Sequence, residues 1–341
     1  MGSVCIVLSV SMVVMACGHL IRNNTTLFLS CTIFVTVALC IHLMPYYIPS
    51  ISEFFSPPTE VISSPTSDSC FSFFHSVMYT AIKESNAHNK TGCDDPLKWI
   101  EPGSVRGCEF HGLQASDASY LLNGSWVVIA GDSQARLVAI SLIALIRGWT
   151  DAVGSIIIDL YKTRTVYSIT LKEIDMKLDF VWAPFVRNLT GLVMEMHASR
   201  NLPDVLVMGA GLWDMLYRNY PPEYGESLSD LRDNALALLP VSSKLNLSLH
   251  LFWVGMPTLI REKLKTEEKR EKMNEAMCSS YEKEVTRTKL SRGFGGPFLK
   301  IEVGALSRLF GTNCTADGMH YDRVVYDAAV QIMLNGLIVE S

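Results

Sequence analysis

The stretch Trp126-Val-Val-Ile-Ala-Gly-Asp-Ser-Gln-Ala-Arg136 predicts a buried strand that turns sharply into a helix. Its apolar run 126–130 has the length of a strand and ends at polar residues. Gly131 permits a sharp exit from the strand, and a helical pattern then runs from Ser133 to about Trp149. Ligands of open α/β sheets bind at the carboxyl ends of the strands, so Ser133 lies where chemistry is expected.

Strands and helices alternate from residue 126 onward. The runs 204–208 and 249–254 are nearly all apolar, as expected for strands that are covered on both faces. Alternation of this kind favours a mainly parallel sheet in a three-layer α/β sandwich. The strand candidates are 126–130, 155–160, 178–183, 204–208, 248–254 and 298–303. The helix candidates are 133–148, 226–238, 262–288 and 321–337, and a further helix at 70–85 is predicted in a loop-rich cap, 70–120.

The segment Asp317-Gly-Met-His320 offers a base and a carboxylate within one turn. A serine hydroxyl is a poor nucleophile unless a base takes its proton. We therefore expect Ser133 to attack, His320 to accept and return the proton, and Asp317 to hold the ring. The alternatives are that Ser133 and Asp317 only cap helices and that His320 is a surface residue.

Gly131-Asp-Ser-x-x-Arg136 followed by a C-terminal Asp317-x-x-His320 resembles the PC-esterase branch of the SGNH/GDSL hydrolase superfamily. That branch includes the trichome-birefringence-like polysaccharide O-acetyltransferases of plants and the luminal domain of the sialic acid O-acetyltransferase. The likeness covers about residues 90–340. It extends to Lys98–Pro102 with Cys108–Phe110, to Gly209–Trp213 and to the ending Asp-Gly-Met-His-Tyr321. The resemblance implies an SGNH-like sandwich and the transfer of an acetyl group to a glycan hydroxyl.

An acyl transfer also needs donors for the oxyanion of the tetrahedral intermediate. The backbone N–H of Ser133, at a helix N-terminus, is the first candidate. A glycine of the turn Gly209-Ala-Gly211 is the second. This turn departs from the wider superfamily, in which an asparagine side chain serves as donor.

Three further residues are candidates for contact with the substrate. Gly131 shapes the nucleophile turn, and Arg136, at i+3 from Ser133, could donate to the acyl oxygen or to an acidic substrate group. The alternative for Arg136 is a salt bridge to Asp132, which we expect to hydrogen-bond the nucleophile turn. Trp213 could stack on a sugar face or belong to the core.

The N-terminal part of the chain is unusually apolar. Residues 3–21 and 27–48 carry no charge, and each is near the length of about 20 residues that spans a bilayer. We interpret residues 1–48 as one or two transmembrane helices, either a hairpin or a single span preceded by an embedded or cleaved segment. Residues 49–69, rich in Pro, Ser and Thr, predict a stem, and residues 70–341 a luminal SGNH-like domain.

The glycosylation sequons and the cysteines are consistent with a luminal location. Disulfides persist in oxidising compartments. Cys93–Cys108 and Cys278–Cys314 are candidate pairs, although the sequence cannot fix the connectivity. No zinc-ligand spacing is present, so we predict no metal site. The net charge of −5, without a basic cluster, argues against binding to nucleic acid. The acceptor sequons begin at Asn89, Asn123, Asn188, Asn246 and Asn313.

The sequence thus predicts a Golgi or endoplasmic-reticulum membrane enzyme that acetylates glycan hydroxyls through an acyl-enzyme on Ser133. The alternatives are a carbohydrate acetyl-esterase with the same triad and a non-catalytic glycan-binding protein. No bound cofactor is expected, and the co-substrate would be an acetyl donor such as acetyl-CoA or an acylated carrier. The expected partners are a glycan or polysaccharide acceptor, the membrane and a multi-span transporter of the acyl donor.

Overall fold

The computed structural model of the chain describes residues 35, 67–87, 93, 108–239 and 249–340. The chain divides into two units, residues 1–63 and 64–341, and the fold described below is that of the second unit. Apart from residue 35, the transmembrane segments predicted in 1–48 lie outside the described residues, as does the predicted stem up to residue 66. Among the helices of the described residues, none is both long enough and apolar enough to cross a membrane.

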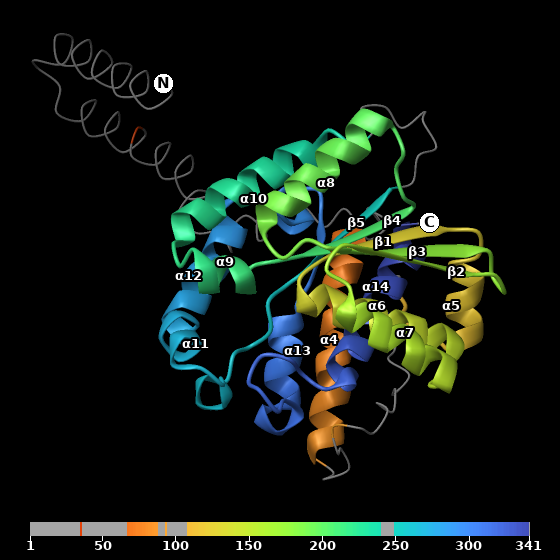
Figure 1. Ribbon diagram of the computed structural model, residues 1–341, viewed down its shortest axis with the longest axis horizontal. Helices are drawn as coiled ribbons and strands as arrows, with labels where there is room; N and C mark the ends of the chain where they lie inside the picture. The colour runs from red at the N-terminus through yellow and green to blue at the C-terminus, as the bar shows by residue number, and fades with distance from the viewer. Residues whose placement is uncertain (1–34, 36–66, 88–92, 94–107, 240–248, 341) are drawn as a thin grey trace, which may run out of the picture. The chain divides into compact units, whose positions relative to one another are not determined.

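A six-stranded sheet forms the centre of the described fold, in the order β2-β3-β1-β4-β5-β6 (Figure 1). Strands β3, β1, β4, β5 and β6 run parallel to one another, and the edge strand β2 pairs antiparallel with β3. The strands are β1 (Trp126–Gly131), β2 (Val166–Leu171), β3 (Met176–Trp182), β4 (Val205–Gly209), β5 (His250–Val254) and β6 (Leu299–Ile301).

Helices cover both faces of this sheet, which makes the three layers that the sequence predicts. Successive residues of β5 show the arrangement: Phe252 and Val254 pack into one core and Leu251 and Trp253 into the other, as the period of two in a strand requires. The first core is covered by α4 (Ser67–Ala87), α5 (Ala115–Leu121), α6 (Ser133–Arg147), α7 (Asp151–Lys162), α13 (Val303–Phe310) and α14 (Arg323–Glu340). The second is covered by α8 (Val186–Ser199), α9 (Leu212–Tyr217), α10 (Pro221–Leu236) and α12 (Glu275–Arg287).

The strand predicted at 155–160 is wrong, because these residues belong to α7. Its Ile-Ile-Ile run favours a strand by composition, but an N-cap and a helical spacing of the buried residues favour a helix. Thr150 caps the helix by accepting from the N–H of Val153 at 3.3 Å, and Val153 and Leu160, two turns apart, are the buried residues. The strand in this region is β2, which the sequence analysis missed because its residues are largely exposed.

The single helix predicted at 262–288 is also interrupted. Helix α11 (Glu267–Lys272) ends before Asn274, whose side chain accepts from the N–H of Met277 at 3.0 Å and starts α12. Asparagine competes with the helical backbone in this way and is therefore favoured at N-caps. Helices α5, α8, α9 and α13 were not predicted.

Both predicted disulfide pairs are wrong. Cys108 bonds to Cys70 of α4, and Cys314 bonds to Cys93. Cys278 is a free thiol on α12, packed against the core on the α10 side of the sheet, whereas Cys314 lies in the core on the opposite side. A Cys278–Cys314 bond would therefore have to cross the sheet.

Candidate active site

The nucleophile turn joins β1 to α6 at the carboxyl edge of the sheet. Asp132 caps α6: its carboxylate accepts from the N–H of Gln134 at 2.9 Å, and its own N–H donates to the carbonyl of Gly209 at 3.2 Å. The side chain is buried, with 1% exposed, and burial raises the pKa of its carboxyl to about 7. The role expected for Asp132, to hold the turn by hydrogen bonds, matches these contacts.

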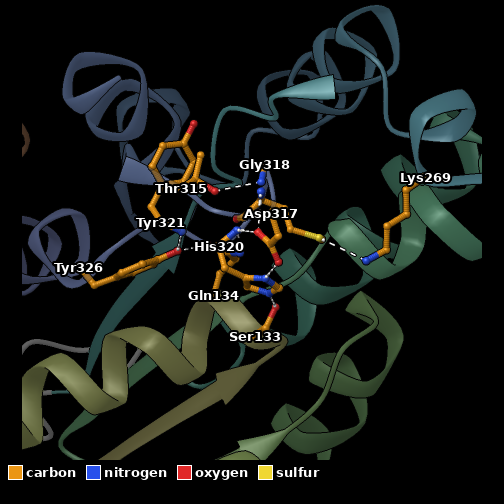
Figure 2. Close-up of polar contacts among 10 residues, drawn as sticks. Ser133, Gln134, Lys269, Thr315, Asp317, Gly318, His320, Tyr321 and Tyr326 are labelled. Carbon is orange, nitrogen blue, oxygen red and sulfur yellow. Dashed lines mark hydrogen bonds and ion pairs between the residues drawn. The ribbon is translucent and has the colours of Figure 1, made fainter. Parts of the chain in front are cut away.

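The structure brings Ser133, His320 and Asp317 into one hydrogen-bonded chain, shown in Figure 2. The Oγ of Ser133 lies 2.7 Å from Nε2 of His320, and Nδ1 of His320 lies 2.7 Å from Oδ2 of Asp317. Because an ionised carboxylate only accepts, the proton of the neutral ring belongs on Nδ1. Nε2 is then free to accept the proton of the Ser133 hydroxyl, which is the arrangement that a general base requires.

Asp317 also fixes the backbone of its own loop. Its Oδ1 accepts from the N–H of Met319 at 3.1 Å and from that of His320 at 2.8 Å. Burial opposes ionisation of this carboxyl, but the hydrogen bonds from the ring and the backbone of His320 outweigh it and hold the pKa of Asp317 below its ordinary value. Asp317 therefore stays ionised opposite the ring, and 37% of the His320 side chain is exposed to solvent.

Distant segments hold this loop in place. The N–H of Ile260 donates to the carbonyl of Gly318 at 2.9 Å. The Nζ of Lys263 donates to the carbonyls of Thr312 and Thr315 at 2.6 and 2.8 Å. The hydroxyl of Thr315 accepts from the N–H of Gly318 at 3.0 Å. The Thr315–Gly318 bond is local, whereas the contacts of Ile260 and Lys263 join segments about 50 residues apart in the chain, and the sequence gives no signal for them.

Gln134 also contacts the His320 loop, and the sequence analysis missed this residue. Its Nε2 donates to the carbonyl of Met319 at 3.0 Å, and its Oε1 accepts from the hydroxyl of Tyr326 at 2.6 Å. Gln134 directly follows Ser133, and Tyr326 lies in α14. A contact between these two segments could be suspected only once Ser133 and His320 were placed together.

Arg136 does not form the predicted salt bridge with Asp132 among the described contacts, nor does it contact Ser133. Its guanidinium lies over the rings of Trp182, Phe180 and Tyr161, with the carbon 4.5, 5.4 and 5.5 Å from the centroids, and it donates to the carbonyl of Thr163 at 3.3 Å. Only 3% of the residue is exposed. These contacts tie α6 to β3 and the loop after α7, so the reading of Arg136 as a substrate contact has no support here.

The predicted glycines allow close backbone packing beside Ser133. A Cβ on Gly131 would lie 2.0 Å from the carbonyl oxygen of Gly209, and Gly131 also has a positive φ of 154°. Gly211 has φ of 147° and a Cβ there would lie 2.7 Å from the sulfur of Met256. The N–H of Ser133 is in the first turn of α6, where a helix leaves its N–H groups without internal partners. It thus remains the first candidate oxyanion donor.

Trp213 is half-buried in an aromatic cluster. Its ring lies edge-on to Trp182 at 5.7 Å and to Phe185 at 5.9 Å and packs against Tyr217 at 5.1 Å between centroids. Beside this cluster is a hollow of about 540 Å³ that includes Trp182, Phe185 and Arg187 in its lining. Asp214, the residue after Trp213, is buried, accepts from the N–H of Val186 at 3.1 Å, and has its pKa raised to about 6 by burial.

Of the predicted sequons, Asn123, Asn188 and Asn313 are exposed, while Asn89 and Asn246 lie outside the described residues.

The described residues contain one group with potential metal ligands, formed by Cys93, Cys314 and Asp322. Its two thiols are joined in a disulfide and so cannot act as thiolate ligands.

Comparison with known proteins places the chain. No protein-family model matches it. The chain is 40% identical to Protein ALTERED XYLOGLUCAN 9 of Arabidopsis thaliana over 357 residues, which covers 99% of this chain and 96% of the relative.

Two solved structures show weaker likenesses. An acetylxylan esterase from Geobacillus stearothermophilus is 14% identical, with 64% of this chain and 95% of that chain covered and a TM-score of 0.36. An alpha/beta hydrolase enzyme from the metagenome of Lake Arreo, Spain, is 13% identical, with 65% and 99% covered and a TM-score of 0.35. TM-scores this low carry no argument about this chain, whereas the near full-length identity does: the chain belongs to the same family as Protein ALTERED XYLOGLUCAN 9 of Arabidopsis thaliana.

Proposed function

We propose that the chain is a serine-dependent O-acetyltransferase that acetylates polysaccharide hydroxyls. The observation that carries this proposal is the chain of two 2.7 Å hydrogen bonds from Ser133 through His320 to Asp317. It lies at the carboxyl edge of a parallel sheet, with the Ser133 N–H at the start of a helix. This arrangement contains the nucleophile, the base, the orienting carboxylate and one oxyanion donor that acyl transfer requires.

The reaction has two steps. In the first, Oγ of Ser133 attacks the acetyl carbonyl carbon of the donor while its proton passes to Nε2 of His320, and His320 then protonates the leaving group. In the second, a sugar hydroxyl loses its proton to His320 and attacks the acetyl-serine. The sugar ester leaves, and the proton returns to Oγ of Ser133. Asp317 stabilises the imidazolium in both steps.

A carbohydrate acetyl-esterase is the second candidate. Its chemistry is the same up to the acetyl-serine, and water then takes the place of the sugar hydroxyl. The resemblance to polysaccharide O-acetyltransferases and the name of the Arabidopsis relative, which refers to xyloglucan, favour a polysaccharide acceptor such as xyloglucan. The hydrogen-bonded chain from Ser133 through His320 to Asp317 disfavours the non-catalytic glycan-binding alternative. A protein that only binds a glycan would have no need for a base held against a serine hydroxyl.

Other parts of the proposal rest on the sequence. The apolar segments within 1–48 and the sequons favour anchoring in a Golgi or endoplasmic-reticulum membrane with the triad in the lumen. The acetyl donor would then have to cross that membrane, so we propose a separate multi-span protein that delivers it. Full transfer activity by the purified chain on a soluble donor, together with a co-purification that yields no multi-span protein, would refute this partner.

The decisive experiment is peptide mapping of the full chain after brief exposure to an activated aryl acetate and an acid quench. We expect an acetyl group on Ser133 that is absent from Ser133→Ala. Ser141→Ala is the matched control, because Ser141 lies on the same helix and hydrogen-bonds Asp327 rather than His320; it should acetylate like the wild type. Adding xyloglucan oligosaccharides then separates transfer from hydrolysis. A folded wild-type chain without an adduct would contradict the proposal.

A further inference from the structure

Gln134 plays no part in the chemistry above, yet it is linked to the backbone on both sides of His320, directly at Met319 and through Tyr326 at Tyr321. Its Nε2 donates directly to the carbonyl of Met319 at 3.0 Å. Its Oε1 accepts from the hydroxyl of Tyr326 at 2.6 Å, and that hydroxyl accepts from the N–H of Tyr321 at 3.5 Å. Figure 2 shows the side chains of Gln134 and Tyr326 beside the His320 loop.

The partners fix the orientation of the Gln134 amide. A carbonyl oxygen can only accept, so the amide nitrogen must face Met319 and the amide oxygen must face the hydroxyl of Tyr326. Both side chains are buried, with 3% of Gln134 and 1% of Tyr326 exposed. Water therefore cannot easily replace a lost hydrogen-bond partner, so breaking one of these bonds costs free energy and their geometry is well defined.

The position of Gln134 in the chain gives these bonds their significance. Ser133 and Gln134 are consecutive residues in the first turn of α6, so the hydroxyl of one and the amide of the other reach the same loop. The Ser133–His320 contact joins residues 187 positions apart. The chain connectivity therefore does not fix the distance between Ser133 and His320. Non-covalent contacts such as those of Gln134 must set that distance.

We propose that Gln134 is a positioning residue, which together with Tyr326 keeps the imidazole of His320 within hydrogen-bonding reach of Ser133. We call the bonds from Gln134 and Tyr326 to the backbone of Met319 and Tyr321 the Gln134 clamp. The proposal rests on the acyl transfer proposed above, in which a misplacement of about 1 Å in a catalytic group costs about 100-fold in rate. Second contacts of this kind hold catalytic side chains in a productive geometry.

Helix α14 offers a matched control for Gln134. Gln331 is also a buried glutamine whose amide bridges the backbone: its Oε1 accepts from the N–H of Leu113 at 2.9 Å, and its Nε2 donates to the carbonyl of Leu113 at 2.7 Å. It has the same side chain and the same number of bridging bonds, but its partner is near α5 rather than in the His320 loop.

The test compares Gln134→Met, Tyr326→Phe and Gln331→Met in the full chain. Acylation by an activated aryl acetate gives a maximal rate and a half-saturating ester concentration. Gln134→Met should lower the maximal rate about 10- to 100-fold, with the half-saturating concentration changed by less than about twofold, because the loss lies in the transition state. The maximal rate of Tyr326→Phe should also fall, but by less, because the hydrogen bond from Gln134 to Met319 remains. Gln331→Met should lose a comparable amount of stability and keep its rate.

Hydrogen exchange provides a readout that does not depend on activity. The amides of Met319 and His320 should exchange about tenfold faster in Gln134→Met, and unchanged in Gln331→Met. If the wild type does not acylate at all, the proposed function fails, and the exchange comparison alone still decides on the clamp. Equal loop exchange in the two variants, or a wild-type maximal rate in Gln134→Met, would overturn the proposal.

Discussion

The nucleophile and the base of the candidate site are held by different kinds of structure. Ser133 is positioned by its own neighbours in the chain: a strand, the Gly131 turn, the Asp132 cap and the first turn of α6. His320 lies in a short loop that is held from elsewhere, by Ile260, Lys263 and Gln134. Changes far away in the sequence should therefore disturb the position of His320 much more readily than that of Ser133.

The largest effect should come from the base side, in Asp317→Asn. The amide would keep an oxygen for the loop N–H groups but would place an NH₂ opposite Nδ1 of His320, which favours the proton on Nε2. That tautomer cannot accept from Ser133, so we expect acylation to fall by about 10³- to 10⁴-fold. Acylation kinetics test this, with the unfolding midpoint as the control for folding. A fall of less than tenfold would show that Asp317 does not set the tautomer.

On the nucleophile side, Gly131→Ala should be the most damaging single methyl group. The new Cβ would meet the carbonyl of Gly209 at 2.0 Å in a backbone conformation with φ of 154°. Overpacking and backbone strain together should lower the free energy of unfolding by about 2–6 kcal/mol. Gly154→Ala in α7 is the control, because nothing lies within 4 Å of its Cβ, and it should stabilise the helix by about 0.5–1 kcal/mol. Chemical denaturation of both variants checks the contrast.

The cap of the nucleophile turn predicts a pH dependence of stability. Burial raises the pKa of Asp132 from 3.8 to about 7, so between these values the folded chain keeps a proton that the unfolded chain has lost. Asp132 therefore lowers the stability of the fold as the pH rises from 3.8 to about 7. Relative to the wild type, Asp132→Asn should gain on the order of 4 kcal/mol of stability across this window. Denaturation at several pH values measures it, and parallel curves for the two proteins would contradict it.

The smallest expected effect comes from Lys263, which holds the His320 loop by its side chain. Lys263→Met removes two hydrogen bonds to the carbonyls of Thr312 and Thr315, which should cost about 1 kcal/mol and loosen the His320 loop. Lys272→Met is the control, since Lys272 forms only a surface pair with Glu268 of the kind worth about 0–1 kcal/mol. Acylation should slow severalfold in the first variant and not in the second. Equal rates would show that the loop does not depend on this tether.

The sequence predicted those parts of the molecule that local rules decide. The strand at 126–130, its exit at Gly131 and the helix from Ser133 follow from apolar runs and a turn residue. Asp317 and His320 follow from the chemical need of a serine for a base. The run at 155–160 failed because β-branched composition suggested a strand, whereas capping by Thr150 and the buried positions of Val153 and Leu160 made a helix.

What the sequence could not predict depends on contacts between distant segments. The disulfide partners, the aromatic box around Arg136 and the bridging role of Gln134 all depend on how elements pack across the sheet. A residue such as Arg136, at the right spacing from Ser133 for a shared role, is directed instead by the rings of β3 and α7. Spacing along a helix gives the direction of a side chain but not the partners that neighbouring elements provide.

The tripeptide Asn313-Cys314-Thr315 would set an order of events during biosynthesis if Asn313 is glycosylated, as the sequence predicts. In the folded chain Asn313 is exposed, but Cys314 is buried in its disulfide with Cys93, and Thr315 is 1% exposed with its hydroxyl bonded to Gly318. An enzyme that adds a glycan must reach the whole tripeptide, so a glycan on Asn313 would have to be attached while the C-terminal segment is still open. Closure of the Cys93–Cys314 bond would then end the period in which that modification can occur.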